Sequence, residues 1–274
     1  MIIYMTTTTS RAKVSPVENP IGLLQQHGQS IWLDFIRRNL ITSGDLARMV
    51  ENDGVTGVTS NPTIFEKAID GSDDYTAQIE ELRRASPDLP AREVYERLVV
   101  KDIQDVADIL HGVYERTACA DGFVSIEVSP GVANNTAATL AEARHLWRAV
   151  ARPNLMIKVP GTEAGIPAVR TLIAEGINVN ITLLFGREMY EAVARAYIDG
   201  LHKRLSRAGA SASGAEMASV ASFFVSRIDT SVDALLHEKL AAATGAQRAR
   251  IERLFGKVAI ANARLAYQSW KQIF

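Results

Sequence analysis

One lysine of the sequence lies where a buried strand is expected. Lys158 stands in the run NLMIKVPGT and is surrounded by strand-forming residues. Since side chains alternate along a strand, Lys158 shares a face with Met156, opposite to Leu155, Ile157 and Val159. A buried amine without a partner tends to lose its proton, and a neutral amine forms Schiff bases with carbonyls. The alternative is a core lysine whose head reaches solvent or a carboxylate.

Polar residues also stand at the ends of the other predicted strands. Short β-branched runs predict strands near 30–34, 55–60, 122–128, 154–159, 177–182 and 219–224. The polar residues in or just after the other five strands are Asp34, Asn61, Ser125, Glu127, Ser129, Asn178, Asn180, Thr182, Ser222 and Arg227. Taken singly, such residues are more often satisfied core groups than catalysts. Their repetition in strand after strand favours a site.

Strand alternation also predicts which faces these polar residues occupy. Asn178, Asn180 and Thr182 share one face, and the other face carries Ile177, Val179, Ile181 and Leu183. In a (β/α) barrel the aliphatic face contacts the helices and the polar face points inward. Catalytic residues of such barrels lie at the carboxyl ends of the strands.

The residue types in this set suit a carbonyl substrate that is polar and anionic. The amine attacks a ketone, and one carboxylate moves protons as the carbinolamine loses water. The second carboxylate moves the proton of a hydroxyl during C–C cleavage, while amides and hydroxyls hold sugar hydroxyls. An arginine can hold a phosphate.

Strands that alternate with long helical stretches predict an α/β fold of the TIM (β/α)8 type, in one domain over residues 19–274. Thr63 and Glu66 suggest a capping box, and residues 64–118 form an all-helical insertion after the second strand. Residues 1–18 are expected to form a disordered tail. Helices are expected at 43–52, 64–69, 74–85, 91–117, 135–150, 163–175, 187–206, 228–243 and 247–273.

Composition excludes several classes of partner and cofactor. A net charge of −1 over 274 residues gives no nucleic-acid footprint, and no apolar run reaches the length of a membrane span. The five histidines lack metal-ligand spacing, so no metal is expected. Neither a dinucleotide fingerprint nor a P-loop follows a strand, so we expect no cofactor. The single Cys119 fits the reducing cytoplasm.

At these residues the chain resembles transaldolases over about residues 20–274. The resemblance is closest to the longer bacterial and actinobacterial type, which is also found fused to phosphoglucose isomerase. It rests on the order and spacing of five runs, which are Gly57–Phe65, Ile126–Val128, Met156–Thr162, Gly176–Phe185 and Ala221–Asp229.

The resemblance implies a role for each site residue. Lys158 would form the Schiff base, Asp34 would act as acid/base for the C3–C4 bond, and Glu127 would act through a water that Thr182 orients. The substrate would be held by Asn61, Asn180, Ser222, Phe224 and Arg227, of which the arginine grips the phosphate. The implied reaction belongs to the non-oxidative pentose phosphate pathway. It moves a dihydroxyacetone unit from sedoheptulose 7-phosphate to glyceraldehyde 3-phosphate, giving erythrose 4-phosphate and fructose 6-phosphate.

The chain departs from the family pattern in the number of strands. Only about six of the eight βα units are predicted before Phe274, so the sequence resembles a transaldolase cut before its last two units. Such a barrel would have two unpaired edges and an exposed interior, and we expect self-association through those edges. Two alternatives stay open, a fructose 6-phosphate aldolase-like enzyme and an inactive truncated fragment. Phe224 favours the transferase over the aldolase. It stands where the transaldolase family has an aromatic residue rather than a proton-donating tyrosine.

Overall fold

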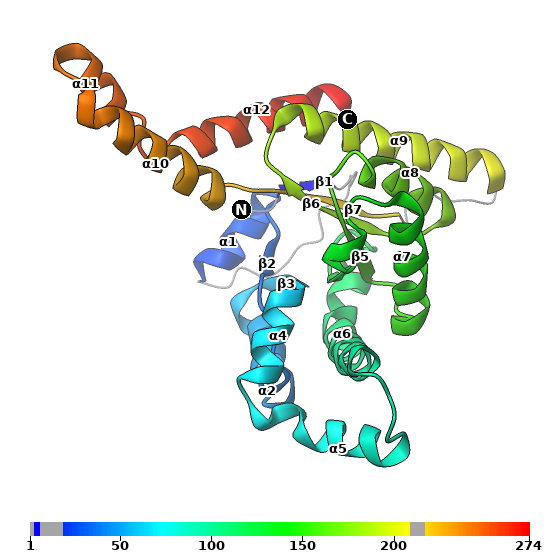
Figure 1. Cartoon of the computed structure of the whole chain (residues 1–274). Coiled ribbons are helices and arrows are strands. Elements are labelled where there is room, and N and C mark those ends of the chain that lie inside the picture. Colours follow the sequence, from blue (N-terminus) through cyan, green and yellow to red (C-terminus); the bar gives the residue numbers. More distant parts are fainter. Residues whose placement is uncertain (1–2, 6–18, 209–216) are drawn as a thin grey trace.

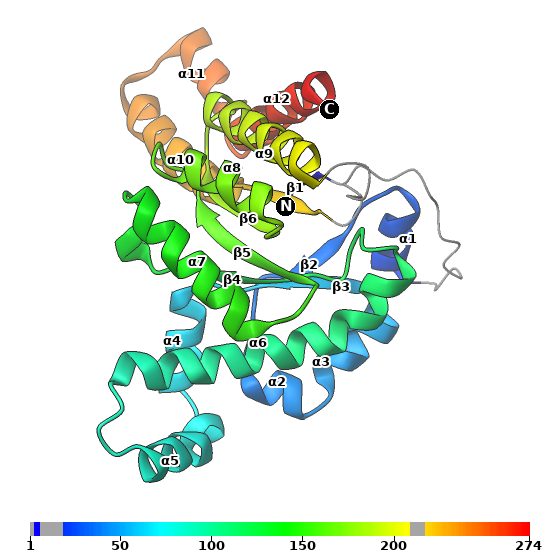
Figure 2. The same cartoon turned by 90° about the vertical axis from the view of Figure 1, so that its right-hand side faces the viewer.

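The computed structural model describes residues 3–5, 19–208 and 217–274, and its centre is a curled seven-stranded sheet in the order β1-β7-β6-β5-β4-β3-β2 (Figure 1). Strands β2 to β7 are parallel and follow one another in chain order. Figure 2 shows that they curve like part of a barrel wall. Their bounds are β2 Ile31–Leu33, β3 Val55–Thr59, β4 Val124–Glu127, β5 Leu155–Pro160, β6 Val179–Leu184 and β7 Ser219–Phe223. All six predicted strands are confirmed, as is the α/β fold of the TIM-barrel type.

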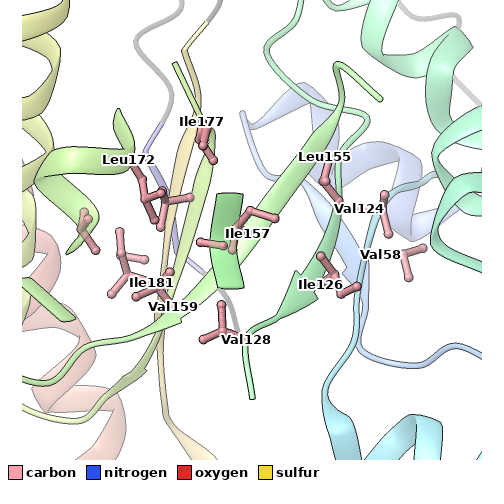
Figure 3. Packing of buried hydrophobic residues seen from close by; sticks show 14 of the residues in the cluster. Val58, Val124, Ile126, Val128, Leu155, Ile157, Val159, Leu172, Ile177 and Ile181 are labelled. Carbon is pink, nitrogen blue, oxygen red and sulfur yellow. The ribbon is translucent and has the colours of Figure 1, made fainter. Parts of the chain in front are cut away.

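The aliphatic face of the sheet packs against the helices, as strand alternation predicted. Leu155, Ile157 and Val159 are fully buried in the main core together with Val124 and Ile181 (Figure 3). Met156 lies on the other face and joins a second cluster inside the curve of the sheet, the inner cluster. The inner cluster comprises Tyr114, Phe123, Met156, Ala218 and Val220, with Trp32 and Cys119 packed against it.

Trp32 fits inside the curve because its neighbour on β3 is a glycine. A Cβ on Gly57 would lie 2.3 Å from the Trp32 indole, closer than any real contact. The indole Nε1–H donates a hydrogen bond of 3.0 Å to Asp121, which also accepts from the Ser30 hydroxyl. Burial raises the pKa of Asp121, although these hydrogen bonds oppose the shift. The inner cluster is thereby closed at the amino ends of the strands.

The helices follow the predicted pattern with three differences. The described helices are α1 Pro20–Gln26, α2 Arg38–Thr42, α3 Asp45–Arg48, α4 Pro62–Asp70, α5 Thr76–Ala85, α6 Ala91–Arg116, α7 Thr136–Val150, α8 Gly165–Glu175, α9 Arg187–Ala208, α10 Ser226–Ala242, α11 Gly245–Glu252 and α12 Val258–Ile273. A π-helical turn, Met49–Asp53, extends α3. None of the helices in the described ranges is both long and apolar enough to cross a membrane.

Each difference has a local physical cause. The single helix predicted over 247–273 is wrong, because Gly256 adopts a φ of 64° and separates α11 from α12. Helices α1 and α2 were not predicted, since they are short and have no buried residues of their own. The predicted capping box at Thr63 is also wrong. Asn61 caps α4 instead, with Pro62 in the first turn.

The expected tail contains one described segment. Ile3–Met5 form β1, which pairs antiparallel with Ser219–Ala221 of β7. The remainder of residues 1–18 lies outside the described residues, so their disorder stays a prediction. The expectation of two unpaired edges is wrong, because β1 covers the β7 edge and leaves β2 paired on one side only among the described strands. The expectation of an exposed interior is also wrong, since Met156 and Val220 are each 1% exposed.

A one-residue bulge interrupts β6 at Leu183. Ile181 pairs with Ala221 and Leu184 pairs with Phe223, so β6 advances three residues where β7 advances two. Leu183 adopts a φ of 60°, a left-handed conformation that is strained for a leucine. The prediction that Leu183 continues the aliphatic face is therefore wrong. Leu184 takes that place and is fully buried in the main core.

Two leucines test the assignment of the main core. We expect Leu155→Ala to lower the free energy of unfolding by about 2–5 kcal/mol, since the side chain is fully buried in close-packed surroundings. Leu265→Ala is the matched control on α12, where the side chain is 53% exposed, and its effect should stay within about 0.5 kcal/mol. Urea denaturation measures both values. Equal losses in the two variants would contradict the assignment.

Candidate active site

Strand register brings the central polar residues into one layer. Glu127 of β4 is paired with Lys158 of β5, and Lys158 is paired with Asn180 of β6. Neighbouring strands lie about 4.8 Å apart, so these three side chains point into the same small volume. The register of the parallel sheet therefore determines the centre of the site.

Lys158 contacts both a carboxylate and a carbonyl. Its Nζ lies 3.2 Å from Oε2 of Glu127 and donates a hydrogen bond of 3.1 Å to the carbonyl oxygen of Ser60. The two charged side chains are 8% and 14% exposed, so the ion pair is largely withdrawn from water. The head of the lysine thus reaches a carboxylate, as in the alternative reading of the sequence. That carboxylate is itself a predicted site residue.

Glu127 is adapted to exchange protons. Burial raises the pKa of this carboxyl, and the nearby charge of Asp34 raises it further. Lys158 and Arg227 act in the opposite direction, and burial outweighs them. A carboxyl whose pKa is raised by burial holds a proton more firmly than an exposed one, which suits a group that accepts a proton and later returns it.

Asn180 is held by hydrogen bonds at both ends of its amide. Its Nδ2 donates to Ser125 Oγ at 3.0 Å, and its Oδ1 accepts from Ser222 Oγ at 2.7 Å. All three side chains are buried, so the amide is fixed beside Lys158. Ser125 shares a face with Glu127 in the sequence, but its contact with Asn180 could be found only from the sheet register.

The remaining predicted residues surround this centre. Thr182 is buried two residues after Asn180, immediately before the bulge. Asn61 accepts a hydrogen bond of 3.0 Å from the Ile64 amide through Oδ1 as the cap of α4, so this contact uses its acceptor and not the donors of Nδ2. Asp34 is exposed in the segment after β2, and its effect on Glu127 places it within electrostatic range.

A buried network fixes the helix that follows Asp34. Arg38, the first residue of α2, donates from Nε to Asp102 at 2.8 Å, and Tyr75 donates to the other carboxylate oxygen at 2.8 Å. The Arg38 amide donates to the Tyr75 hydroxyl at 3.3 Å. The helical insertion, which contains Tyr75 and Asp102, therefore positions the segment that bears Asp34.

Aromatic rings and an arginine form the rim of the site beyond β6 and β7. The Arg227 guanidinium lies 4.5 Å from the centroid of the Phe224 ring, which stacks on Phe185 at 5.1 Å. Sequence reasoning identified Phe224 and Arg227 but missed Phe185. The predicted strand ended at residue 182, and alternation continued from Ile181 and Leu183 would put Phe185 on the aliphatic face, so the pattern gave no signal for it.

A cavity of about 450 Å³ adjoins the layer on the side of α4, α6 and α7. Ser60, Asn61 and Glu127 line its inner wall, and Phe65, Tyr95 and Leu146 form part of its outer wall. Glu127 therefore contacts Lys158 and also borders a space large enough to admit water.

The structure brings together most of the predicted residues and separates one from them. Asn178 lies at the amino end of β6, where it donates to the Pro153 and Leu155 carbonyls and accepts from the Ala218 amide. It bridges three strands and takes no part in the site. Across the described ranges, no three His, Cys, Asp or Glu side chains are grouped so as to hold a metal ion.

Comparison with known proteins adds the family to this geometry. A model of the family described as transaldolase/fructose-6-phosphate aldolase matches residues 31–273, which contain every predicted site residue. The chain belongs to the transaldolase/fructose-6-phosphate aldolase family. The runs that suggested the resemblance lie on β3 to β7, around the layer of Glu127, Lys158 and Asn180.

Curated members of the transaldolase family match nearly the whole chain. A transaldolase of Trichodesmium erythraeum is 50% identical over 258 residues, which are 94% of this chain and 67% of that protein. Transaldolase 2 of Nostoc punctiforme is 53% identical over 91% of this chain and 65% of its own length. A transaldolase of Saccharopolyspora erythraea is 47% identical over 92% and 64%. The chain thus spans about two thirds of the length of these relatives.

The ion pair between Lys158 and Glu127 gives a prediction about stability. We expect Lys158→Met to lower the free energy of unfolding by about 3–5 kcal/mol near neutral pH, because Glu127 stays buried without its partner. The double variant Lys158→Met/Glu127→Leu should recover most of that loss, since no buried charge remains. Urea denaturation of the parent and the Lys158→Met, Glu127→Leu and double variants completes the cycle.

The pH dependence of the same variant has a definite sign. In Lys158→Met the pKa of Glu127 rises further in the folded state, above its unfolded value of about 4.3. The folded protein then binds more protons than the unfolded chain between the two pKa values, so stability falls as pH rises through that window. The loss should be absent below the unfolded pKa. A loss independent of pH would contradict the burial of an ionisable Glu127.

Proposed function

We propose that this protein is a transaldolase that transfers a dihydroxyacetone unit through a Schiff base on Lys158. The observation that supports this most strongly is the 3.2 Å contact between Lys158 Nζ and Glu127 in a buried layer of adjacent strands. Membership of the family and the names of the relatives support the same reaction. The donor proposed is sedoheptulose 7-phosphate and the acceptor is glyceraldehyde 3-phosphate.

The first step joins the lysine to the ketone of the donor. The ammonium of Lys158 passes a proton to Glu127, and the neutral amine attacks C2 to give a carbinolamine. Glu127 then returns the proton through a water held by Thr182, and the carbinolamine hydroxyl leaves as water. The raised pKa of Glu127 suits both halves of this exchange.

The second step breaks the C3–C4 bond. Asp34 removes the proton of the C4 hydroxyl, the C3–C4 electron pair moves onto the iminium, and erythrose 4-phosphate leaves. The three-carbon unit stays on Lys158 as an enamine. Addition of its C3 to the aldehyde of glyceraldehyde 3-phosphate, with a proton returned by Asp34, and hydrolysis of the imine then give fructose 6-phosphate. The carbon atoms balance, because a seven-carbon donor and a three-carbon acceptor give a four-carbon and a six-carbon product.

Other residues of the layer would hold the substrate. Asn180 and Asn61 are proposed to bind hydroxyls of the three-carbon unit, and Ser222 a further substrate hydroxyl. Arg227 is proposed to bind the phosphate, because the guanidinium lies at the rim. Phe224 favours transfer over release to water, because its ring offers no proton to the carbanion.

The setting of the reaction is part of the proposal. The free thiol of Cys119 suits the cytoplasm, where thiols stay reduced. Self-association is proposed to use the β2 edge, because β1 covers the β7 edge.

Trapping the covalent intermediate tests the reaction. The chain is incubated with fructose 6-phosphate, reduced with borohydride and mapped by peptide mass spectrometry. We expect a dihydroxyacetone adduct on Lys158, loss of the adduct in Lys158→Met, and no change in Lys101→Met, whose lysine is 53% exposed on α6. Glu127→Gln should slow adduct formation by about 100-fold or more. An adduct spread over surface lysines would count against the proposal.

The mass of the adduct tests the role of Asp34. Asp34→Asn should still form the imine with fructose 6-phosphate but break the C3–C4 bond about 100-fold more slowly. Borohydride would then trap the intact six-carbon phosphate on Lys158 in place of the three-carbon unit. Trapping with dihydroxyacetone, which needs no cleavage, serves as the control. A normal three-carbon adduct from fructose 6-phosphate would rule out this role.

A further inference from the structure

We propose that Phe185 is a positioning residue that holds the guanidinium of Arg227 ready for the substrate phosphate. The inference rests on the proposed function, because it concerns how the same site recognises a phosphorylated sugar. It assigns a role to a residue that sequence alternation put on the opposite face of the sheet.

The bulge at Leu183 turns Phe185 towards the site. Without the extra residue, Phe185 would share the outward face with Ile181, which packs in the main core. With it, Leu184 takes the outward position and Phe185 follows on the inward side. A left-handed φ at a leucine is unfavourable, and such strain persists where surrounding structure enforces it.

The ring of Phe185 stacks on the ring of Phe224, which in turn contacts the guanidinium of Arg227. Phe185 and Phe224 stack at 5.1 Å with an angle of 16° between their planes. On the Phe224 ring lies the Arg227 guanidinium, 4.5 Å from the centroid. The ring of Phe185 thereby restricts Phe224, and Phe224 in turn offers a fixed face to the cation.

Arg227 keeps its hydrogen-bond donors available for an anion. Within the described residues, Arg227 forms no ion pair with a carboxylate. Eight other arginines do form such pairs. A guanidinium held by its face leaves its edge free, and the edge carries the donors that bind phosphate in a forked geometry.

The backbone of Phe185 is fixed from two sides. The Asn262 side chain of α12 donates to the Phe185 carbonyl at 2.7 Å, and the Phe224 amide donates to the Leu184 carbonyl at 2.9 Å. Phe185 remains 41% exposed despite these contacts. An exposed aromatic ring on a fixed backbone is consistent with a role in recognition.

Two ring substitutions and one matched control test the proposal. Phe185→Leu keeps apolar volume but removes the ring face, and Phe185→Tyr keeps the ring. Phe274→Leu is the control, because that ring is 42% exposed and ends α12. Adduct formation on Lys158 is measured against concentration for fructose 6-phosphate and for dihydroxyacetone, which lacks a phosphate.

The expected readout is the ratio of the two half-saturation concentrations. Phe185→Leu should raise the half-saturation concentration of fructose 6-phosphate, relative to that of dihydroxyacetone, by about three- to tenfold. Phe185→Tyr and Phe274→Leu should keep the parent ratio. An unchanged ratio in Phe185→Leu, or an equal change in Phe274→Leu, would overturn the proposal.

A second measurement does not depend on the reaction. Phenylglyoxal modifies arginines, and inorganic phosphate should protect Arg227 from it, as followed by peptide mass spectrometry. Phe185→Leu should need about three- to tenfold more phosphate for half-protection than the parent. If no adduct forms on Lys158 but phosphate protects Arg227 less well in Phe185→Leu than in the parent, the proposed function is wrong and the role of Phe185 is retained. Equal protection in both proteins would remove that role.

Discussion

The contact between Lys158 and Glu127 is the interaction on which the rest of the site depends. Burying either charge alone would cost several kcal/mol, so each side chain tolerates its place because the other is there. Register keeps the two side by side, and the Ser60 carbonyl accepts a further hydrogen bond from the amine. The main core and the inner cluster bury most of the surface around the pair, and the cavity beside Glu127 is the side on which water can approach. The same burial raises the pKa of Glu127.

Polar residues have different tasks at the two ends of the sheet. At the amino ends, Asn154 donates to the Ala107 and Gly122 carbonyls, and Asn178 bridges three strands. The side-chain amides of Asn154 and Asn178 therefore form hydrogen bonds with backbone groups. One layer nearer the carboxyl ends, Asn180 contacts other side chains and lies next to Lys158 in the sheet register. The same residue type is thus structural at one end and chemically available at the other.

How far the sequence predicts this structure depends on the range of each interaction. All six parallel strands and the faces on which Glu127, Lys158 and Asn180 lie follow from local alternation, whereas the pairing that puts these three residues in one layer comes from the sheet register. Alternation fails at Leu183, because an inserted residue is enforced by pairing between β6 and β7 and by contacts from α12. Phe185 was missed for that reason. The short β1 was also missed, since its only support is a partner more than 200 residues away.

The order of the strands has a consequence for synthesis of the chain. From β2 to β7, each strand pairs with the strand made just before it, so the layer can be built in the order in which the ribosome delivers it. Among the described strands β1 is the exception, because it precedes the others in the chain but pairs with β7. The β7 edge with which β1 pairs is synthesised only after β4 and β5, which carry Glu127 and Lys158. The pairing of Ile3–Met5 is therefore suited to follow the assembly of β2 to β7 during synthesis.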